Sequence, residues 1–253
     1  MGRRLGQHFL SNPAILDRIV EALEPQPDDV VIEVGPGRGT LTARLAPRVA
    51  RVVAIEKDAA LAGALSASGL PPNVRIVRGD ALEVPWHEGS KVIGNIPYYI
   101  TTPLIEKALS PPLPRLVVFL VQKEVAERLA AAPGSKTFGA LSAGVQAFAA
   151  VERLWVLRRG AFQPPPKVDS AVVRLRPLER PLVGIEEQGA WRRFLASLFS
   201  QRRKQLTRSL RAMTGWEKDQ VDALLRSLDL DPACRPETLG PQALVGVFRA
   251  LAR

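Results

Sequence analysis

Val30-Val31-Ile32-Glu33-Val34-Gly35-Pro36-Gly37-Arg38-Gly39-Thr40 is the part of the sequence that most clearly indicates the fold class. A β-branched run followed by glycines and then a helical apolar pattern predicts a buried parallel strand that turns into a helix. The glycines allow the backbone to approach a ligand closely. Their spacing is G-x-G-x-G and not the G-x-G-x-x-G of dinucleotide-binding folds, so a pyrophosphate site is a poorer match. The stretch therefore predicts a ligand-binding loop that follows a buried strand.

Polar residues stand at the ends of three further predicted strands, which cover residues 51–55, 74–77 and 91–96. Glu56 follows the first, Asp80 follows the second, and Asn95 lies at the end of the third. In open α/β sheets, ligands bind outside the carboxyl ends of the strands. Each acid alone is also compatible with a solvated loop. Together they predict a site for a nucleoside-bearing cofactor, with Glu56 on the ribose hydroxyls and Asp80 on the adenine amino group.

The residues Asn95-Ile96-Pro97-Tyr98 suit the presentation of an exocyclic amine for alkylation. An adenine N6 is a poor nucleophile because its lone pair is delocalised into the ring. The Asn95 side chain and the Ile96 carbonyl can each accept one N6–H bond, and this would aim the lone pair outward. Pro97 fixes the backbone, and Tyr98 offers a flat face to a flipped-out base. The alternative is a strand that runs into a proline turn with an inward-packed tyrosine.

These motifs together resemble those of S-adenosylmethionine-dependent adenine-N6 methyltransferases. Three more stretches resemble segments of the ribosomal RNA adenine dimethyltransferases: the N-terminal segment that caps the cofactor, a helix after a strand, and a proline-rich loop with its following strand. They are Leu5–Leu10, Val121–Leu129 and Phe162–Val173. The match runs in order from residue 5 to about residue 176. It is closest to the small-subunit adenine-N6,N6-dimethyltransferases.

The resemblance implies an α/β fold with a Rossmann-like class I methyltransferase sheet, seven-stranded with an antiparallel final hairpin and with helices on both faces. It implies S-adenosylmethionine as cofactor and the double methylation of two adjacent adenosines near the 3′ end of small-subunit rRNA. The cofactor-binding residues carried over by this match are His8, Leu10, Gly35, Gly37, Glu56, Asp80 and Asn95. Position 8 is often Asn in the family, so the contact that His8 makes is left open.

The catalytic residues implied by the match are Asn95, Ile96, Pro97, Tyr98 and Phe162. Phe162 precedes three prolines, which predict a stiff, extended loop. Two interpretations of this ring stand side by side. It either fills the core, or it stacks on the face of the target adenine opposite Tyr98, as similar residues do in the family.

The chain changes character near residue 180. Up to that point strands alternate with helices, which indicates a mainly parallel sheet. Pro177, Pro181 and Gly184 then mark a hinge. The pattern beyond is helical, with helices predicted over residues 191–199, 201–213, 217–228 and 241–251. We therefore expect a catalytic domain over residues 1–180 and a small all-α domain over residues 181–253.

A net charge of +10 favours an anionic partner. The densest basic stretch, residues 200–211, contains no acid. Such a run is often a solvated helix face, but beside a base-methylating pocket it predicts a helix that binds rRNA phosphates. The residues expected to do so are Arg202, Arg203, Lys204 and Arg208.

Several classes of protein do not fit the sequence. Cys234 is the single cysteine, so no internal disulfide is possible and a reducing compartment is indicated. The N-terminus has no apolar leader, and the longest apolar run, residues 116–121, is too short to span a bilayer. Two histidines and one cysteine give no metal-ligand cluster. We expect a cytoplasmic protein without metal or membrane contact that acts, as a monomer, on small-subunit rRNA in an assembling ribosomal subunit.

Three alternatives remain. A resistance-type large-subunit rRNA methyltransferase shares the pocket motif, but the proline-rich loop and the length of the C-terminal domain argue against it. A DNA adenine methyltransferase would be expected to carry a separate sequence-reading domain. A ribosome-assembly or transcription factor that had lost the chemistry would have a broken glycine loop or a replaced Asn95, and both are intact.

Overall fold

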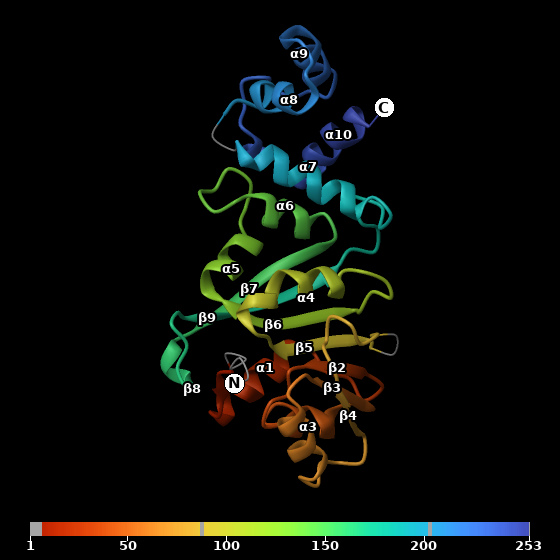
Figure 1. Ribbon diagram of the computed structural model, residues 1–253, viewed down its shortest axis with the longest axis vertical. Coiled ribbons are helices and arrows are strands. Elements are labelled where there is room, and N and C mark those ends of the chain that lie inside the picture. Colours follow the sequence, from red (N-terminus) through yellow and green to blue (C-terminus); the bar gives the residue numbers. More distant parts are fainter. Residues whose placement is uncertain (1–6, 87–88, 202–203, 253) are drawn as a thin grey trace. The chain divides into compact units, whose positions relative to one another are not determined.

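The computed structural model describes residues 7–86, 89–201 and 204–252 (Figure 1). The chain divides into two compact units. The first contains the described residues up to 126 together with residues 151–177. The second contains residues 127–150 and the chain from residue 178 onward. Residues 127–150 thus pack with the helical unit, although they precede the boundary predicted at residue 180.

A seven-stranded sheet forms the centre of the first unit, in the order β4-β3-β2-β5-β6-β9-β7. The strands are β2 (Val30–Val34), β3 (Arg51–Glu56), β4 (Val74–Arg78), β5 (Lys91–Asn95), β6 (Leu116–Gln122), β7 (Ala149–Leu157) and β9 (Ser170–Pro177). The strands from β2 to β6 pair in parallel, and β9 pairs antiparallel with β6. This confirms the predicted α/β sheet with an antiparallel end.

Two very short strands form a separate antiparallel pair that the sequence does not predict. They are β1 (Phe9–Leu10) and β8 (Phe162–Gln163), with Leu10 opposite Phe162. The proline-rich loop is therefore attached at its start to the N-terminal segment.

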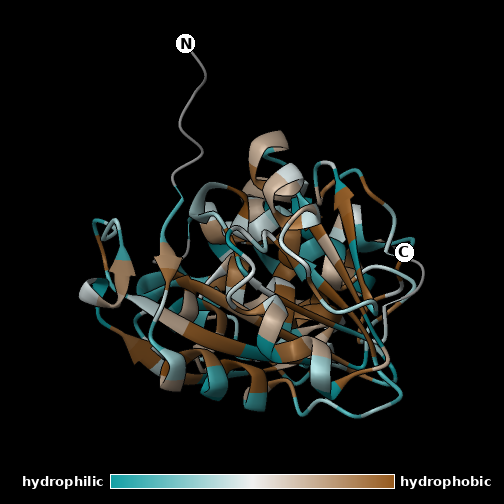
Figure 2. Cartoon of the chain, turned by 90° about the horizontal axis from the view of Figure 1, so that it is seen from below, coloured by the Kyte–Doolittle hydropathy of each residue, from teal (hydrophilic) through white to brown (hydrophobic). Residues whose placement is uncertain are grey.

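The helices of the first unit connect and cover the strands. They are α1 (Pro13–Ala22), α2 (Thr42–Leu45), α3 (Ala59–Ser66) and α4 (Thr101–Ala108), and α5 (Lys123–Leu129) leads from β6 into the second unit. Figure 2 shows the strands as largely hydrophobic ribbons among helices of mixed character. The helix α1 begins where its residue types predict, because the Asn12 side chain accepts a hydrogen bond from the Ile15 N–H at 3.2 Å and Pro13 occupies the first position.

The second unit is helical in its described part. Its helices are α6 (Ala140–Gln146), α7 (Gln188–Ser200), α8 (Leu206–Thr214), α9 (Lys218–Ser227) and α10 (Pro241–Leu251). Trp191 lies at the centre, with ring centroids 5.5 Å from those of Phe194 and Phe248. The predicted all-α C-terminal region is thereby confirmed.

One predicted helix boundary is wrong. The helix expected over residues 201–213 begins only at Leu206. Gln205 has an extended backbone, and the Leu206 N–H donates to the Cys234 carbonyl at 2.7 Å. Lys204 therefore lies ahead of α8, in a bend, and not on the helix.

A buried carboxylate joins the amino ends of three neighbouring strands. Asp29, which precedes β2, is fully buried and accepts hydrogen bonds from Lys91 Nζ at 2.8 Å and Arg115 at 2.6 Å. Ser90 Oγ and the Gln26 N–H also donate to it. Burial raises the pKa of the Asp29 carboxyl, but the bonds from Lys91, Gln26 and Ser90 outweigh this effect and hold the pKa below its usual value. Since Lys91 begins β5 and Arg115 precedes β6, the cluster fixes where these strands start.

We predict that Asp29→Ala lowers the free energy of unfolding by about 3–5 kcal/mol at neutral pH, because it leaves the buried Lys91 ammonium without its counter-charge. Asp28→Ala is the matched control, since this neighbouring acid is exposed and its loss should cost less than about 0.5 kcal/mol. Urea unfolding of the three proteins measures the difference. A lowered folded-state pKa means that the contribution of Asp29 is present at neutral pH and is lost as the pH falls through that pKa. Equal stability of the two variants would contradict the role of the cluster.

Candidate active site

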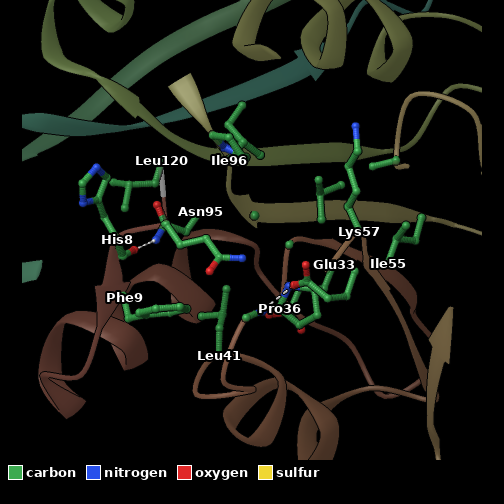
Figure 3. Close-up of a pocket in the computed structure, with 18 of the residues that line it drawn as sticks. His8, Phe9, Glu33, Pro36, Leu41, Ile55, Lys57, Asn95, Ile96 and Leu120 are labelled. Carbon is green, nitrogen blue, oxygen red and sulfur yellow. Dashed lines mark hydrogen bonds between the residues drawn. The ribbon is translucent and has the colours of Figure 1, made fainter. Parts of the chain in front are cut away.

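A pocket opens at the carboxyl ends of the parallel strands (Figure 3). The empty volume of the pocket is about 1160 Å³ when the part of its mouth that is open to solvent is included. The predicted cofactor-binding residues all line it, as do the predicted catalytic residues other than Phe162. Its lining includes His8, Leu10, Glu33, Gly35, Gly37, Glu56, Lys57, Asp80, Asn95, Ile96, Pro97, Tyr98 and Tyr99.

The loop after β2 has the backbone that only glycine adopts without strain. Gly35 and Gly37 have φ values of +68° and +58°. A Cβ on Gly37 would lie 2.9 Å from the Phe9 ring, which leaves no room for a side chain. The Gly35 N–H donates to the Ile55 carbonyl at 3.0 Å and so holds the loop against the end of β3. The loop therefore presents bare backbone to the pocket.

Glu56 ties the tip of β3 to this loop. Its side chain is buried, with Oε2 accepting the Gly37 N–H at 3.0 Å and Oε1 accepting the Asp58 N–H at 2.9 Å. Each carboxylate oxygen can accept a second hydrogen bond. The carboxylate is thus fixed in orientation and still able to accept from a pair of hydroxyls.

Asp80 is held at the end of β4 by two donors. Its Oδ1 accepts the Leu82 N–H at 2.9 Å, and its Oδ2 accepts Lys57 Nζ at 2.6 Å. The hydrogen bond from Lys57 holds the pKa of the Asp80 carboxyl below its usual range. Lys57 was not predicted as a site residue, since a lysine after a strand has no distinctive pattern.

Asn95 is oriented by the N-terminal segment. Its Nδ2 donates to the His8 carbonyl at 2.7 Å, a bond drawn in Figure 3. Since the amide nitrogen is directed at His8, Oδ1 is left as an acceptor. The His8 ring is in turn hydrogen-bonded through Nδ1 to the Pro164 carbonyl at 2.8 Å. Within the chain, His8 therefore contacts both the orienting asparagine and the proline-rich loop.

The rest of the motif is packed against the protein or hydrogen-bonded to it. Ile96 is buried, and Pro97 leads into a short 3₁₀ helix over Tyr98–Ile100. The Tyr98 hydroxyl is 2.6 Å from Ser170 Oγ, a partner that the sequence did not predict. Burial raises the pKa of Tyr98 above its ordinary value, so its phenol stays neutral at physiological pH. The ring is therefore anchored at its polar end.

Phe162 packs in the core of the first unit. It is 5 % exposed and belongs to the same apolar cluster as Leu10 and Leu157. It does not line the pocket. Stacking on the target base from the face opposite Tyr98 remains a prediction, and it would require this ring to leave its present packing.

Glu33 is a site residue to which the sequence pattern assigned no role. It lies on β2, is 1 % exposed and lines the pocket. Its Oε2 has no hydrogen-bond partner among the described residues. Burial raises the pKa of this carboxyl to about 7; the nearby Thr42 hydroxyl opposes the rise and the charge of Glu56 adds to it. An acid inside the apolar run VVIEV was the signal that could have identified it.

The predicted phosphate-binding residues are only partly within the described chain. Lys204 and Arg208 are exposed, the first in the bend before α8 and the second on α8 itself. Arg202 and Arg203 lie outside the described residues.

Among residues 7–86, 89–201 and 204–252, no group of three or more His, Cys, Asp or Glu side chains could hold a metal ion. None of the helices placed in these ranges has the length and apolar character needed to cross a bilayer.

Comparison with known proteins points to one family. A sequence model of the family described as "Ribosomal RNA adenine dimethylase" matches residues 2–229. The chain is 40% identical over 263 residues to the "Ribosomal RNA small subunit methyltransferase A" of Synechococcus elongatus, covering 97% of this chain and 93% of that protein. The protein of the same name from Geobacillus kaustophilus is 39% identical to this chain over 265 residues, and the match covers 99% of this chain and 90% of the Geobacillus protein.

Solved structures agree with this result. A dimethyladenosine transferase from Plasmodium falciparum has a TM-score of 0.84 and 30% identity, covering 95% of this chain and 96% of that one. The 23S rRNA methyltransferase ErmE has a TM-score of 0.75 and 28% identity, covering 97% of this chain and all of that one. The sheet and the C-terminal helices thus have the fold of class I methyltransferases of this kind.

The raised pKa of Glu33 predicts how stability depends on pH. The ordinary pKa of a glutamate carboxyl is 4.5, whereas that of Glu33 in the folded protein is about 7. The folded protein therefore loses stability as the pH rises from 4.5 to 7, and the full loss persists at every pH above 7. Glu33→Gln removes this titration. We expect the stability of the ligand-free variant relative to the parent to increase by about 2–4 kcal/mol between pH 4.5 and pH 8. Urea unfolding across this pH range measures it, and a difference that does not change with pH would refute the assignment.

Proposed function

Because the chain belongs to the ribosomal RNA adenine dimethylase family, we propose that it methylates N6 of two adjacent adenosines near the 3′ end of small-subunit rRNA in an assembling ribosomal subunit. The end product is N6,N6-dimethyladenosine. One observation carries the proposal: an Asn95 amide held by His8 lies in the same pocket as the glycine loop and the acids Glu56 and Asp80.

The pocket suits S-adenosylmethionine, the methyl donor of this family. When bound, this cofactor supplies an electrophilic methyl group on its sulfonium. Glu56 has free acceptor capacity for the ribose hydroxyls, and Asp80 for the adenine amino group. The buried Glu33 Oε2, which has no partner among the described residues, suits the positive ammonium of the methionine portion. The bare backbone at Gly35 and Gly37 lets the ligand approach closely.

The target adenine is oriented by the motif that begins at Asn95. The Asn95 Oδ1 and the Ile96 carbonyl each accept one N6–H bond, so that the nitrogen lone pair points toward the methyl group. Tyr98, anchored by Ser170, offers its ring face to the flipped base. With the cofactor bound, the N6 lone pair would form the new N–C bond as the S–C bond of the sulfonium breaks, and no covalent bond to the enzyme would be needed. The cationic product nitrogen then loses a proton to water.

A second transfer follows from the same arrangement. After the first methylation N6 retains one N–H, and one of the two acceptors can still hold it. Dimethylation requires space beside the base for the first methyl group. This requirement is what separates a dimethyltransferase from an enzyme that stops after one methyl group.

We assign rRNA binding to residues 181–253, with the catalytic role in residues 1–180. Lys204 and Arg208 are exposed and cationic, and they stand beside Arg202 and Arg203 in the sequence. Each arginine or lysine side chain that neutralises a phosphate adds to the affinity for RNA and to its dependence on salt. The enzyme would act as a monomer in the cytoplasm, where its ribosomal substrate is assembled.

The main rival is a large-subunit rRNA methyltransferase, since the 23S rRNA methyltransferase ErmE shares the fold. The higher identity to proteins named for the small subunit favours the proposal. Incubating the protein and methyl-labelled cofactor with immature small subunits, naked rRNA and large subunits separates the two. We expect label in the small-subunit rRNA, and label confined to large subunits would reject the proposal.

Asn95→Ala should reduce methyl transfer far more than cofactor binding. The loss of one positioned hydrogen bond to the reacting group should cost about 2–4 kcal/mol in the transition state. Single-turnover rates on small subunits measure this effect, and calorimetry with the cofactor is the control. If the rate stays within a few-fold of the parent, Asn95 does not orient N6.

Glu56→Ala and Asp80→Ala should each weaken cofactor binding by about 1–3 kcal/mol, because each removes acceptors for a polar group of the ligand. Glu83→Ala is the matched control, since Glu83 is an exposed acid close to Asp80 in the chain and outside the pocket lining. Calorimetry of the variants tests the assignment. Unchanged affinity in both site variants would show that the cofactor binds elsewhere.

A further inference from the structure

A second depression lies on the first unit, apart from the machinery described above. It lies between α1 and the end of β7 with the short 3₁₀ helix Arg159–Ala161 that follows. Its lining includes Arg18, Trp155 and Arg158. Arg159 follows directly in the chain. We call Arg18, Arg158 and Arg159 the β7 arginine patch.

The charge of this patch is not neutralised within the described chain. Its three arginines are exposed, and none has a carboxylate partner among the described residues. The lining of the depression contains no acid among those residues. The nearby Asp169 accepts the backbone N–H of Arg159 at 2.9 Å, which is not a contact with its guanidinium. Such concentrated positive charge favours an anionic ligand.

One of the arginines is held in place by an aromatic ring. The Arg18 guanidinium carbon lies 4.0 Å from the centroid of the Trp155 ring. This cation–π contact restrains the side chain while leaving its N–H donors available. Guanidinium groups bind phosphate oxygens with paired hydrogen bonds, so the patch has the chemistry of a phosphate site.

The patch and the pocket share structural elements. Leu16 and Ile19 of α1 line the pocket, while Arg18 of the same helix lines the depression. From Arg159 the chain continues through a 3₁₀ turn into β8, which pairs with β1 at the pocket wall. The patch is therefore connected, through α1 and β8, to the side of the pocket that the N-terminal segment forms.

We propose that the β7 arginine patch binds backbone phosphates of the RNA strand next to the target adenosine. The catalytic unit thereby holds its substrate directly, in addition to any contact made by the C-terminal helices. This inference rests on the proposed function. The contrasting possibility is that Arg18 and Trp155 only fasten α1 to β7, in which case Arg158 and Arg159 would contribute nothing to RNA binding.

The test neutralises Arg158 and Arg159 together as Arg158→Gln/Arg159→Gln, which leaves the contact between Arg18 and Trp155 intact. The matched control is Arg75→Gln/Arg78→Gln. Arg75 and Arg78 are exposed arginines on β4, and β4 and β7 are the two edge strands of the sheet. The control therefore removes the same charge from the opposite edge of the sheet. The probe is a fluorescent RNA hairpin with two adjacent unpaired adenosines, titrated by anisotropy over a range of KCl concentrations.

The test variant should bind the hairpin more weakly, and the magnitude of its log–log salt slope should fall by about 0.7–0.9 for each phosphate that the variant no longer neutralises. The control should keep the slope of the parent. Cofactor affinity and thermal unfolding should be unchanged in the test variant, which shows that it is folded. A parent-like slope in the test variant, an equal fall in the control, or a parent that does not bind the hairpin would overturn the inference.

The two proposals fail in different ways. If the parent labels small subunits while the test variant keeps the slope of the parent, the patch assignment alone is wrong. If the slope falls as expected but the parent labels only large subunits, the substrate assignment is wrong and the patch still binds RNA.

Discussion

The hydrogen bond from Asn95 Nδ2 to the His8 carbonyl, 2.7 Å long, is the contact on which the site depends. It joins the end of a central strand to a segment near the start of the chain. Three further contacts hold that segment in place: Phe9 packs against Gly37, Leu10 pairs with Phe162, and Thr40 Oγ1 donates to the Leu10 carbonyl. The glycine loop, the orienting asparagine and the proline-rich loop are therefore all positioned around the same three residues. A change in residues 8–10 would disturb both the cofactor side and the base side of the pocket.

The two ends of the sheet serve different purposes. At the amino ends Asp29 is satisfied by donors from several segments, and it stabilises the start of the strands. At the carboxyl ends the acids keep acceptor capacity, and Glu33 is buried with an oxygen that has no partner in the described chain. Such a group costs stability in the free protein. The buried Glu33 oxygen lacks a hydrogen-bond partner among the described residues at the place where we expect a charged ligand. Such exceptions to the pairing of buried polar groups are typical of functional sites.

The sequence predicted those features that depend on local pattern. The strands β2 to β6 follow from apolar runs, and the pocket follows from polar residues at their ends, because parallel strands align those ends at one edge. Contacts between residues far apart in the chain have no such signal. The two-residue pair of β1 with β8 joins residues 9–10 to residues 162–163. The sequence left two interpretations of the Phe162 ring open, and the structure shows it buried. Lys57 at Asp80 and the bend before Leu206 arise from tertiary hydrogen bonds that no periodicity reveals.

The identity of the end product is the sharpest test of the proposed site, since the pocket must accept the target nitrogen twice. Small subunits from cells that lack the modification are treated with the protein and excess S-adenosylmethionine, and their rRNA is digested to nucleosides for mass spectrometry. We expect N6,N6-dimethyladenosine as the final product, with N6-methyladenosine only transient. If N6-methyladenosine instead accumulates as the terminal product under these conditions, the site does not hold N6 through both transfers and the proposed mechanism is wrong.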